Sequence, residues 1–270
     1  MEQRLVPQKL TEVRSPDGTS IACWQAGSGR RLAAVHGVTI DHSCWDGLRA
    51  QIEQHHALLA IDRRGHGASG PGPGEYSLER EVEDLLAVLD QADDSVDLLA
   101  HSYGGLIALE AALRSSRIRR LVLYEPSIDD DPDFPGVLER VTALVASGDH
   151  ERAAATLLVE RSGVPPEAID TVRGLPLWPI LLRGAQVLPR EGQAIIAYRF
   201  EAQRFADLTT PALILVGSES PAWRHRAMDA LDAALPHSEL RLLPGQGHLA
   251  THTAPELLAR ETLRFLRLLV

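Results

Sequence analysis

One serine of the chain lies in a setting that suits a nucleophile. Ser102 follows an apolar run at residues 96–100 that has the length and composition of a buried strand, and a helical pattern over residues 103–114 begins directly after it. Ala100 and Gly104 flank the serine at two residues' distance, so small residues surround a sharp turn. The start of a helix offers free N–H groups that stabilise an oxyanion. The expected chemistry is attack of the Ser102 hydroxyl on a carbonyl carbon.

A histidine near the end of the chain is the candidate general base. His248 closes the loop at residues 244–248, between a predicted strand at 239–243 and a predicted helix at 255–269. A base on such a loop can reach the Ser102 hydroxyl and accept its proton. His252, four residues after His248, is interpreted as a solvated loop residue.

Two further turns follow predicted strands. The apolar residues 31–35 lead into His36-Gly37-Val38, where glycine permits a tight backbone path. The apolar residues 57–61 lead into a glycine-rich turn at 62–70, which we interpret as architectural.

Taken with the Ser102 turn, these stretches resemble the α/β-hydrolase family. The family's nucleophile elbow has the pattern Gly-x-Ser-x-Gly, from which this chain departs by carrying Ala100 at the first glycine, and residues 62–69 resemble its Asp-x-x-Gly-x-Gly-x-Ser turn. The resemblance implies an oxyanion hole made by the backbone N–H groups of Val38 and Tyr103. It also implies that His36 and Gly37 lie at the substrate.

The acid that would orient His248 has two candidates. The usual family position, counted from Gly217, falls on Ser220, and Glu219 stands one residue earlier. Some relatives carry the acid after the strand that follows the nucleophile helix, and in this chain Glu125 matches that alternative position. Either strand end can deliver a carboxylate to the imidazole. We favour Glu125 over Glu219.

The pattern of strands and helices defines the fold that must position these residues. Short apolar strands alternate with amphipathic helices, which predicts a buried, mostly parallel sheet of the α/β class. With the resemblance, we expect an eight-stranded α/β-hydrolase sheet flanked by helices. Residues 127–207 show helical periodicity without a good strand and predict a helical cap, with residues 1–126 and 208–270 forming the core. The alternative is a set of surface helices covering one face of the sheet.

Composition narrows the classes of partner. The chain has 270 residues and a formal net charge of −10, which argues against a nucleic-acid partner. It has two cysteines, no apolar run of membrane-spanning length, and no signal-peptide pattern in its first ten residues. We therefore expect a cytoplasmic protein with reduced thiols that acts on a small-molecule substrate without metal or cofactor. The oligomeric state is left open.

The function expected from the resemblance is hydrolysis of an ester, thioester or lactone-like carbonyl compound through an acyl-enzyme. Epoxide hydrolases and dehalogenases of the family use an aspartate nucleophile, and Ser102 argues against both. An alternative remains, because relatives of this fold also bind small molecules or catalyse cyclisation or elimination, and a fold does not determine a function. Covalent labelling of Ser102 by a fluorophosphonate distinguishes a serine hydrolase from a binding protein.

Overall fold

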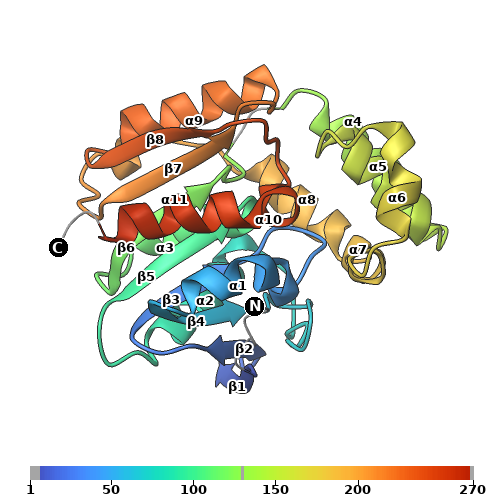
Figure 1. The fold of residues 1–270 in the computed structure, drawn as a ribbon. Coiled ribbons are helices and arrows are strands. Elements are labelled where there is room, and N and C mark those ends of the chain that lie inside the picture. The colour runs from blue at the N-terminus through green and yellow to red at the C-terminus, as the bar shows by residue number, and fades with distance from the viewer. Residues whose placement is uncertain (1–6, 129–130, 268–270) are drawn as a thin grey trace.

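An eight-stranded sheet runs through the centre of the computed structural model, which describes residues 7–128 and 131–267 (Figure 1). The strand order is β1-β2-β4-β3-β5-β6-β7-β8. The pairs β1–β2 and β2–β4 are antiparallel, and the remaining neighbours are parallel. The strands are β1 (Lys9–Arg14), β2 (Ser20–Ala26), β3 (Arg30–Val35), β4 (His56–Ile61), β5 (Val96–His101), β6 (Ile118–Tyr124), β7 (Ala212–Gly217) and β8 (Ser238–Leu243).

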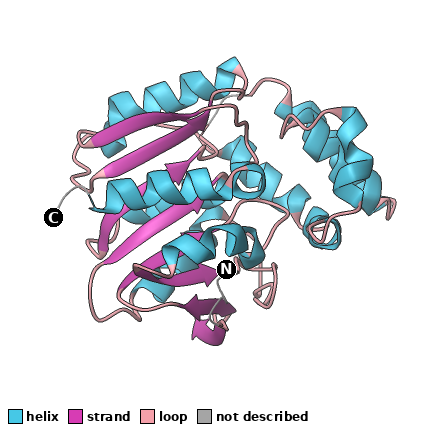
Figure 2. Cartoon of the chain, in the orientation of Figure 1, coloured by secondary structure: helices cyan, strands magenta, loops and turns pink. Residues whose placement is uncertain are grey.

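Helices cover both faces of this sheet (Figure 2). Strands β4 and β5 lie on opposite sides of β3, so right-handed crossovers place the helices between them on opposite faces. Accordingly, α1 packs on α11 and α2 packs on α3. The helices of the core are η1 (His42–Trp45), α1 (Asp46–Ile52), α2 (Leu78–Leu89), α3 (Tyr103–Ala112), α9 (Ala222–Ala234), α10 (Ala250–Thr253) and α11 (Pro255–Arg267).

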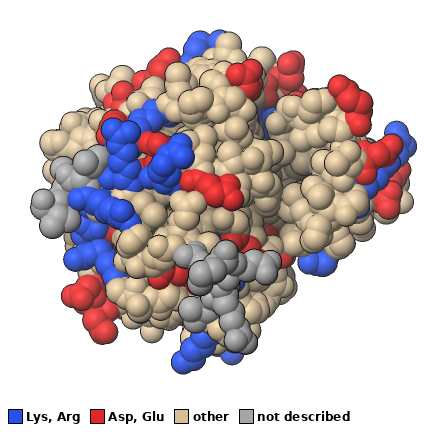
Figure 3. All heavy atoms as spheres, viewed as in Figure 1, with Lys and Arg blue, Asp and Glu red and all other residues tan. Residues whose placement is uncertain are grey.

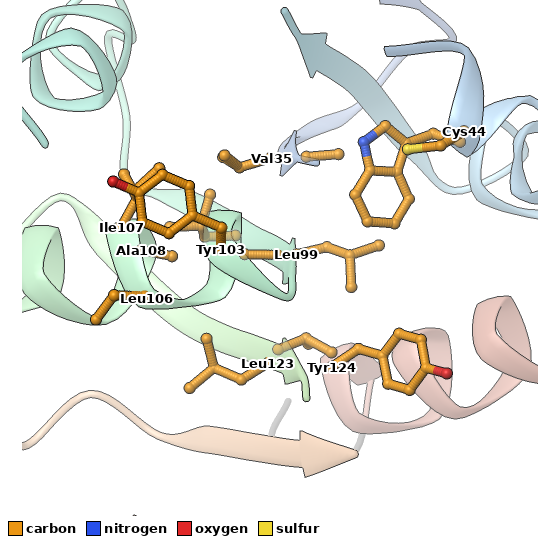
Figure 4. Packing of buried hydrophobic residues seen from close by; sticks show 14 of the residues in the cluster. Val35, Cys44, Leu99, Tyr103, Leu106, Ile107, Ala108, Leu123 and Tyr124 are labelled. Atoms are coloured by element: carbon orange, nitrogen blue, oxygen red, sulfur yellow. The ribbon is translucent and has the colours of Figure 1, made fainter. Parts of the chain in front are cut away.

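The hydrophobic core lies between the sheet and these helices. Strands β4, β5 and β7 are buried along their whole length, as expected for strands covered on both faces. Figure 4 shows side chains of β3, β5, β6 and α3 in this core, including Tyr103 and Tyr124. Ser77 caps α2 by accepting the N–H of Arg80. The predicted sheet of eight mostly parallel strands flanked by helices is confirmed.

The chain between β6 and β7 folds as helices at one end of the sheet, beside α10 (Figure 1). Within residues 127–128 and 131–207, the structure contains no strand. Helix α4 packs on α5 and α8, and α5 packs on α7. We call residues 127–207 the helical insert; its helices are α4 (Phe134–Ala146), α5 (His150–Glu160), η2 (Pro166–Ala168), α6 (Ile169–Arg173), α7 (Trp178–Ala185), α8 (Leu188–Ala197) and η3 (Ala202–Phe205).

The last part of the insert differs from the sequence prediction. The helical periodicity of residues 194–205 predicts one continuous helix there, but α8 ends at Ala197, and Tyr198 is extended with ψ 141°. The Tyr198 hydroxyl donates to Glu110 of α3 at 2.8 Å, so the chain leaves the helix at a point anchored to the core. Helix α7 was not predicted as a separate element. Both differences arise from tertiary contacts that local periodicity does not report.

Acidic and basic side chains share the surface seen in Figure 3, and basic ones gather over the C-terminal half of α11, which carries Arg260, Arg264 and Arg267. Among the described helices, none combines the length and hydropathy needed to cross a bilayer. Residues 1–6, on which the signal-peptide expectation partly rests, and residues 268–269 of the predicted last helix lie outside the described residues.

Candidate active site

Ser102 stands at the junction of β5 and α3 in a strained conformation. Its φ of 54° and ψ of −121° fall outside the regions that L-residues favour. The turn is tight enough to require glycine behind it: a Cβ on Gly104 would come within 2.4 Å of the His36 oxygen, and one on Gly105 within 2.8 Å of Pro126. The backbone therefore presents the serine hydroxyl at the carboxyl end of the sheet.

His248 and Glu125 complete a hydrogen-bonded chain with this serine. His248 Nδ1 donates to Glu125 Oε2 at 2.6 Å, because an ionised carboxylate only accepts. His248 Nε2 is then free to accept the proton of Ser102 Oγ, which lies at 3.0 Å. Glu125 is 1 % exposed and follows β6, while His248 is partly buried in the loop after β8. The structure thus brings together the three residues that the sequence singled out.

Glu219, the alternative acid, points elsewhere. Its side chain is exposed and accepts a hydrogen bond from Ser218 Oγ at 3.0 Å. Ser220, at the usual family position of the acid, instead donates its hydroxyl to Glu125 Oε1 at 2.5 Å. The N–H of Gly217 donates to the same oxygen at 2.8 Å. The β7 loop therefore supports Glu125 with donors.

Arg224 and Ser127 belong to this cluster, although the sequence analysis did not identify them. Arg224 Nη1 donates to Glu125 Oε2 at 2.6 Å and also contacts His248 Nδ1. The Glu125 carboxylate therefore accepts hydrogen bonds from a buried guanidinium as well as from the imidazole. The sequence pattern predicts a helix over residues 226–235, whereas α9 begins at Ala222 and places Arg224 in its first turn. Ser127 Oγ lies 3.3 Å from Ser102 Oγ. Neither residue had a motif that marked it.

The loop after β3 lies directly beside the serine. A Cβ on Gly37 would come within 2.9 Å of Ser102 Cβ, and Val38 lines a cavity together with Ser102 and His248. The N–H of Tyr103 is in the first turn of α3, where N–H groups have no partner within the helix. Val38 and Tyr103 therefore both lie beside Ser102 in the structure.

The His36 side chain is not among the residues that line this cavity, and the substrate-binding role expected for it stays a prediction. It is fully buried, its Nδ1–H donates to the Gly37 oxygen at 2.8 Å, and its Nε2 accepts the N–H of Arg63 at 3.0 Å. Burial lowers the pKa of His36 well below its usual value, with added repulsion from His66 and Arg63. A neutral imidazole is what this pair of bonds requires. The backbone of both residues still packs against the turn of Ser102: Gly37 approaches Ser102 itself, and the His36 oxygen approaches Gly104.

His101 is a second buried imidazole at the site. Its Nε2 lies 3.0 Å from the His248 oxygen, and its ring stacks on Tyr124 at 4.9 Å. Burial lowers the pKa of His101 to about 3, so the ring is neutral at neutral pH. It therefore donates a hydrogen bond to the backbone of His248 and fixes the loop that carries the candidate base.

A cavity of about 130 Å³ opens at Ser102 between the core and the helical insert. Its core side carries the polar groups of Ser102, His101 and His248, and its insert side is mostly aliphatic. The residues that line it from the insert are Ser127, Phe134, Leu157, Leu158, Arg161, Ser162, Val164, Val172, Leu175, Leu177, Leu181 and Ile195. An apolar pocket with few convergent polar groups is typical of a small-molecule site.

Within the described residues, three side chains with metal-ligand atoms lie together outside this cavity. The ligand atoms of Asp41, His42 and Asp62 are all within 4.8 Å of one another. Asp62 already accepts hydrogen bonds from Trp24 Nε1 at 2.9 Å, His42 Nδ1 at 2.8 Å and the Ala68 N–H at 2.9 Å. Burial raises the pKa of Asp62, but the bonds from His42 and Ala68 outweigh it and lower the pKa to about 2. Hydrogen bonding accounts for this cluster.

The fold agrees with comparisons to known proteins. A family model described as "Alpha/beta hydrolase family" matches residues 33–261. The chain belongs to the alpha/beta hydrolase family. It is similar to a crystal structure of an alpha/beta hydrolase from Sphaerobacter thermophilus, with 31% identity, a TM-score of 0.82, and coverage of 95% of this chain and 100% of that one.

Further relatives carry hydrolase names. A hydrolase from Pseudomonas aeruginosa has 27% identity and a TM-score of 0.83, with 96% of this chain and 98% of that chain covered. The pimeloyl-[acyl-carrier protein] methyl ester esterase of Citrobacter koseri is 28% identical over 83% of this chain and 90% of its own length. The expected family membership is therefore confirmed, and the chain is an α/β-fold hydrolase.

Proposed function

We propose that this hydrolase cleaves an ester, thioester or lactone-like carbonyl compound through an acyl-enzyme on Ser102. The observation that carries the proposal is the continuous hydrogen-bonded chain from Ser102 Oγ through His248 to Glu125, with distances of 3.0 and 2.6 Å. Esterase names among the relatives support the same substrate class.

The geometry supports a two-step reaction. His248 Nε2 takes the Ser102 proton as Oγ attacks the carbonyl carbon, and the carbonyl oxygen becomes an oxyanion. The N–H groups of Val38 and Tyr103 stabilise that oxyanion, and Glu125 stabilises the imidazolium. His248 then gives the proton to the leaving alcohol or thiol, which departs from the acyl-enzyme. A water molecule, deprotonated by the same histidine, releases the acid and restores Ser102.

The helical insert acts as a cap in this proposal. Its aliphatic wall covers the cavity opposite the polar groups of the core, which favours an apolar acyl or alcohol group of modest size. Residues 1–126 and 208–270 would supply the chemistry, and residues 127–207 would select the substrate. A small molecule is the partner that such a cavity fits.

Labelling with a fluorophosphonate tests the nucleophile. We expect stoichiometric covalent labelling of wild-type Ser102, located by peptide mass spectrometry, together with hydrolysis of p-nitrophenyl butyrate. Ser102→Ala should lose the label and lower kcat by about 10⁴- to 10⁶-fold, because the nucleophile has no replacement. A thermal melt serves as the folding control.

Two outcomes would contradict the proposal. Hydrolysis by Ser102→Ala at a rate near that of the wild type would move the nucleophile to another residue. An unlabelled, inactive wild type that binds apolar carbonyl compounds would identify a binding protein instead of a hydrolase.

A further inference from the structure

Two adjacent arginines, Arg63 and Arg64, lie buried after β4 in different surroundings. Arg64 Nε donates to Asp84 at 2.6 Å, and its Nη1 donates to Asp17 at 3.0 Å. The Arg63 side chain reaches instead to the backbone of Gly37, the residue before Val38. The pair therefore offers a comparison between two buried guanidinium groups of similar chemistry.

The Arg63 guanidinium is shared among three acceptors from three elements. It donates to Glu81 of α2 at 2.7 Å, to Glu191 of α8 at 2.5 Å, and to the backbone oxygen of Gly37 at 2.9 Å. The side chains of Arg63, Glu81 and Glu191 are each at most 3 % exposed. Burial lowers the pKa of Arg63, but the Glu191 and Glu81 carboxylates outweigh it and hold the pKa well above its usual value. The fork is charged and geometrically fixed.

The bond to Gly37 bears directly on the oxyanion hole. The Gly37 oxygen and the Val38 N–H belong to one peptide group, and in a trans peptide they point in opposite directions. The described part of the chain contains no cis peptide bond. Donors from Arg63 and from His36 Nδ1 meet at that oxygen. They fix the direction of the Val38 N–H and, by polarising the peptide, strengthen it as a donor.

Arg63 also contacts the residue that carries the second oxyanion donor. Its Cζ lies 4.7 Å from the centre of the Tyr103 ring, a cation–π distance. The Tyr103 hydroxyl lies 3.0 Å from that of Tyr76, which in turn donates to Glu81 at 2.9 Å. Figure 4 shows the Tyr103 ring among the buried side chains of α3. One guanidinium thus contacts both the Gly37–Val38 peptide group and the side chain of Tyr103.

Glu191 brings the helical insert into the same network. Its Oε1 contacts His66 Nε2 at 2.7 Å in addition to Arg63. Burial raises the pKa of Glu191, but Arg63 and His66 outweigh it and lower the pKa to about 2. The charged carboxylate on α8 therefore reaches Arg63 only when the insert is docked on the core.

We infer that Arg63 is a positioning residue that holds the two oxyanion donors, and that Glu191 holds Arg63, so docking of the helical insert is coupled to formation of the oxyanion hole. The inference rests on the proposed function, since it assigns how that site is completed. Without the Arg63 fork, the Val38 peptide retains only the His36 donor and rotates more freely. Ser102, His248 and Glu125 are untouched by the change.

The test compares Arg63→Met with the matched control Arg64→Met, using p-nitrophenyl butyrate hydrolysis and a trifluoromethyl ketone whose adduct carries an oxyanion. We expect Arg63→Met to lower kcat by about 10- to 100-fold, less than the loss of an oxyanion donor itself. KM should stay within about threefold, and ketone affinity should fall in parallel with kcat. Arg64→Met should keep kcat within about twofold, and Glu191→Gln should lower kcat by roughly 3- to 10-fold.

Folding is monitored by circular dichroism, and Arg63→Lys with Arg64→Lys replaces the methionine pair if either methionine variant unfolds. A lysine keeps the charge but offers its donors from one nitrogen and cannot reproduce the planar fork that spans Glu81, Glu191 and Gly37, so Arg63→Lys should still lower kcat. Folded Arg63 variants with wild-type kcat and ketone affinity would overturn the inference alone. An equal loss in the Arg64 variants would also overturn it, because burial of any guanidinium would then suffice. Absence of Ser102 labelling in the wild type would remove the proposed function and this inference together.

Discussion

The two walls of the cavity are built by different means. On the core wall, Ser102 and, buried behind His248, Glu125 follow neighbouring parallel strands, and their φ values of 54° and 45° are held by the surrounding backbone. On the insert wall, aliphatic side chains of helices α5 to α8 face the same space without comparable backbone constraints. Reaction geometry therefore depends on the sheet, whereas the shape of the pocket depends on side chains that can be exchanged individually.

Removal of the Glu125 carboxylate, behind the core wall, should give the largest effect of the remaining tests. We expect Glu125→Gln to lower kcat for p-nitrophenyl butyrate by about 10²- to 10⁴-fold, because an amide cannot stabilise the imidazolium. The matched variant Glu219→Gln, on the exposed loop, should keep kcat within about twofold. The reverse result would move the acid to the β7 loop, and loss in neither variant would indicate a Ser102–His248 dyad.

The core wall should also make stability depend on pH. The pKa of His101 is lowered to about 3 by burial, compared with about 6.5 in an unfolded chain. As pH falls through this window, the unfolded chain takes up a proton that the folded protein does not. The free energy of unfolding should then fall by up to about 1.4 kcal/mol per pH unit from this residue.

Urea denaturation between about pH 7 and about pH 5 measures this dependence. His101→Phe should show a shallower fall in unfolding free energy than the wild type, by about 2 kcal/mol over the range. Exposed His237 provides the control, since His237→Asn should retain the wild-type slope. Equal slopes for His101→Phe and the wild type would show that His101 takes up protons in the folded state.

Truncation of a side chain on the insert wall should change the selectivity among acyl esters and have a smaller effect on kcat. Leu158 is buried and lines the cavity, so Leu158→Ala should shift the ratio of kcat/KM for longer over shorter p-nitrophenyl acyl esters by about tenfold. Leu138 of α4 packs against Gly192 and serves as the matched control. An unchanged ratio in Leu158→Ala, or an equal shift in Leu138→Ala, would show that the insert side of the cavity does not select the substrate.

The sequence predicted the sheet and the helices next to it well because their signals are local. Predicted strands at residues 9–14, 57–61 and 212–216 match β1, β4 and β7 to within a residue. The periodicity of residues 194–205 was misleading, because Tyr198 leaves the helix to bond Glu110. Helix α7 is short, at Trp178–Ala185, and its pattern did not stand out from its neighbours.

The candidate site was also predictable only where its signals are local, and tertiary contacts account for what the sequence did not show. Ser102, His248 and Glu125 follow strands, and strand ends of a parallel sheet meet at one edge, so residue type and position were enough to select them. His36 has the same strand-end position, but its side chain turns inward to bond its neighbour's backbone and the N–H of Arg63. No local pattern distinguishes these two outcomes.

The amino-acid sequence by itself determined the fold family and selected the candidate nucleophile and base, because these depend on strand length, small residues at a turn, and order along the chain. Tertiary structure alone decided which carboxylate contacts His248, that Arg224 joins it, and that Glu191 reaches Arg63 across 128 residues of sequence. The physical reason is that a buried charge must find a partner or hydrogen bonds, and the packing of distant elements determines which partner is within reach.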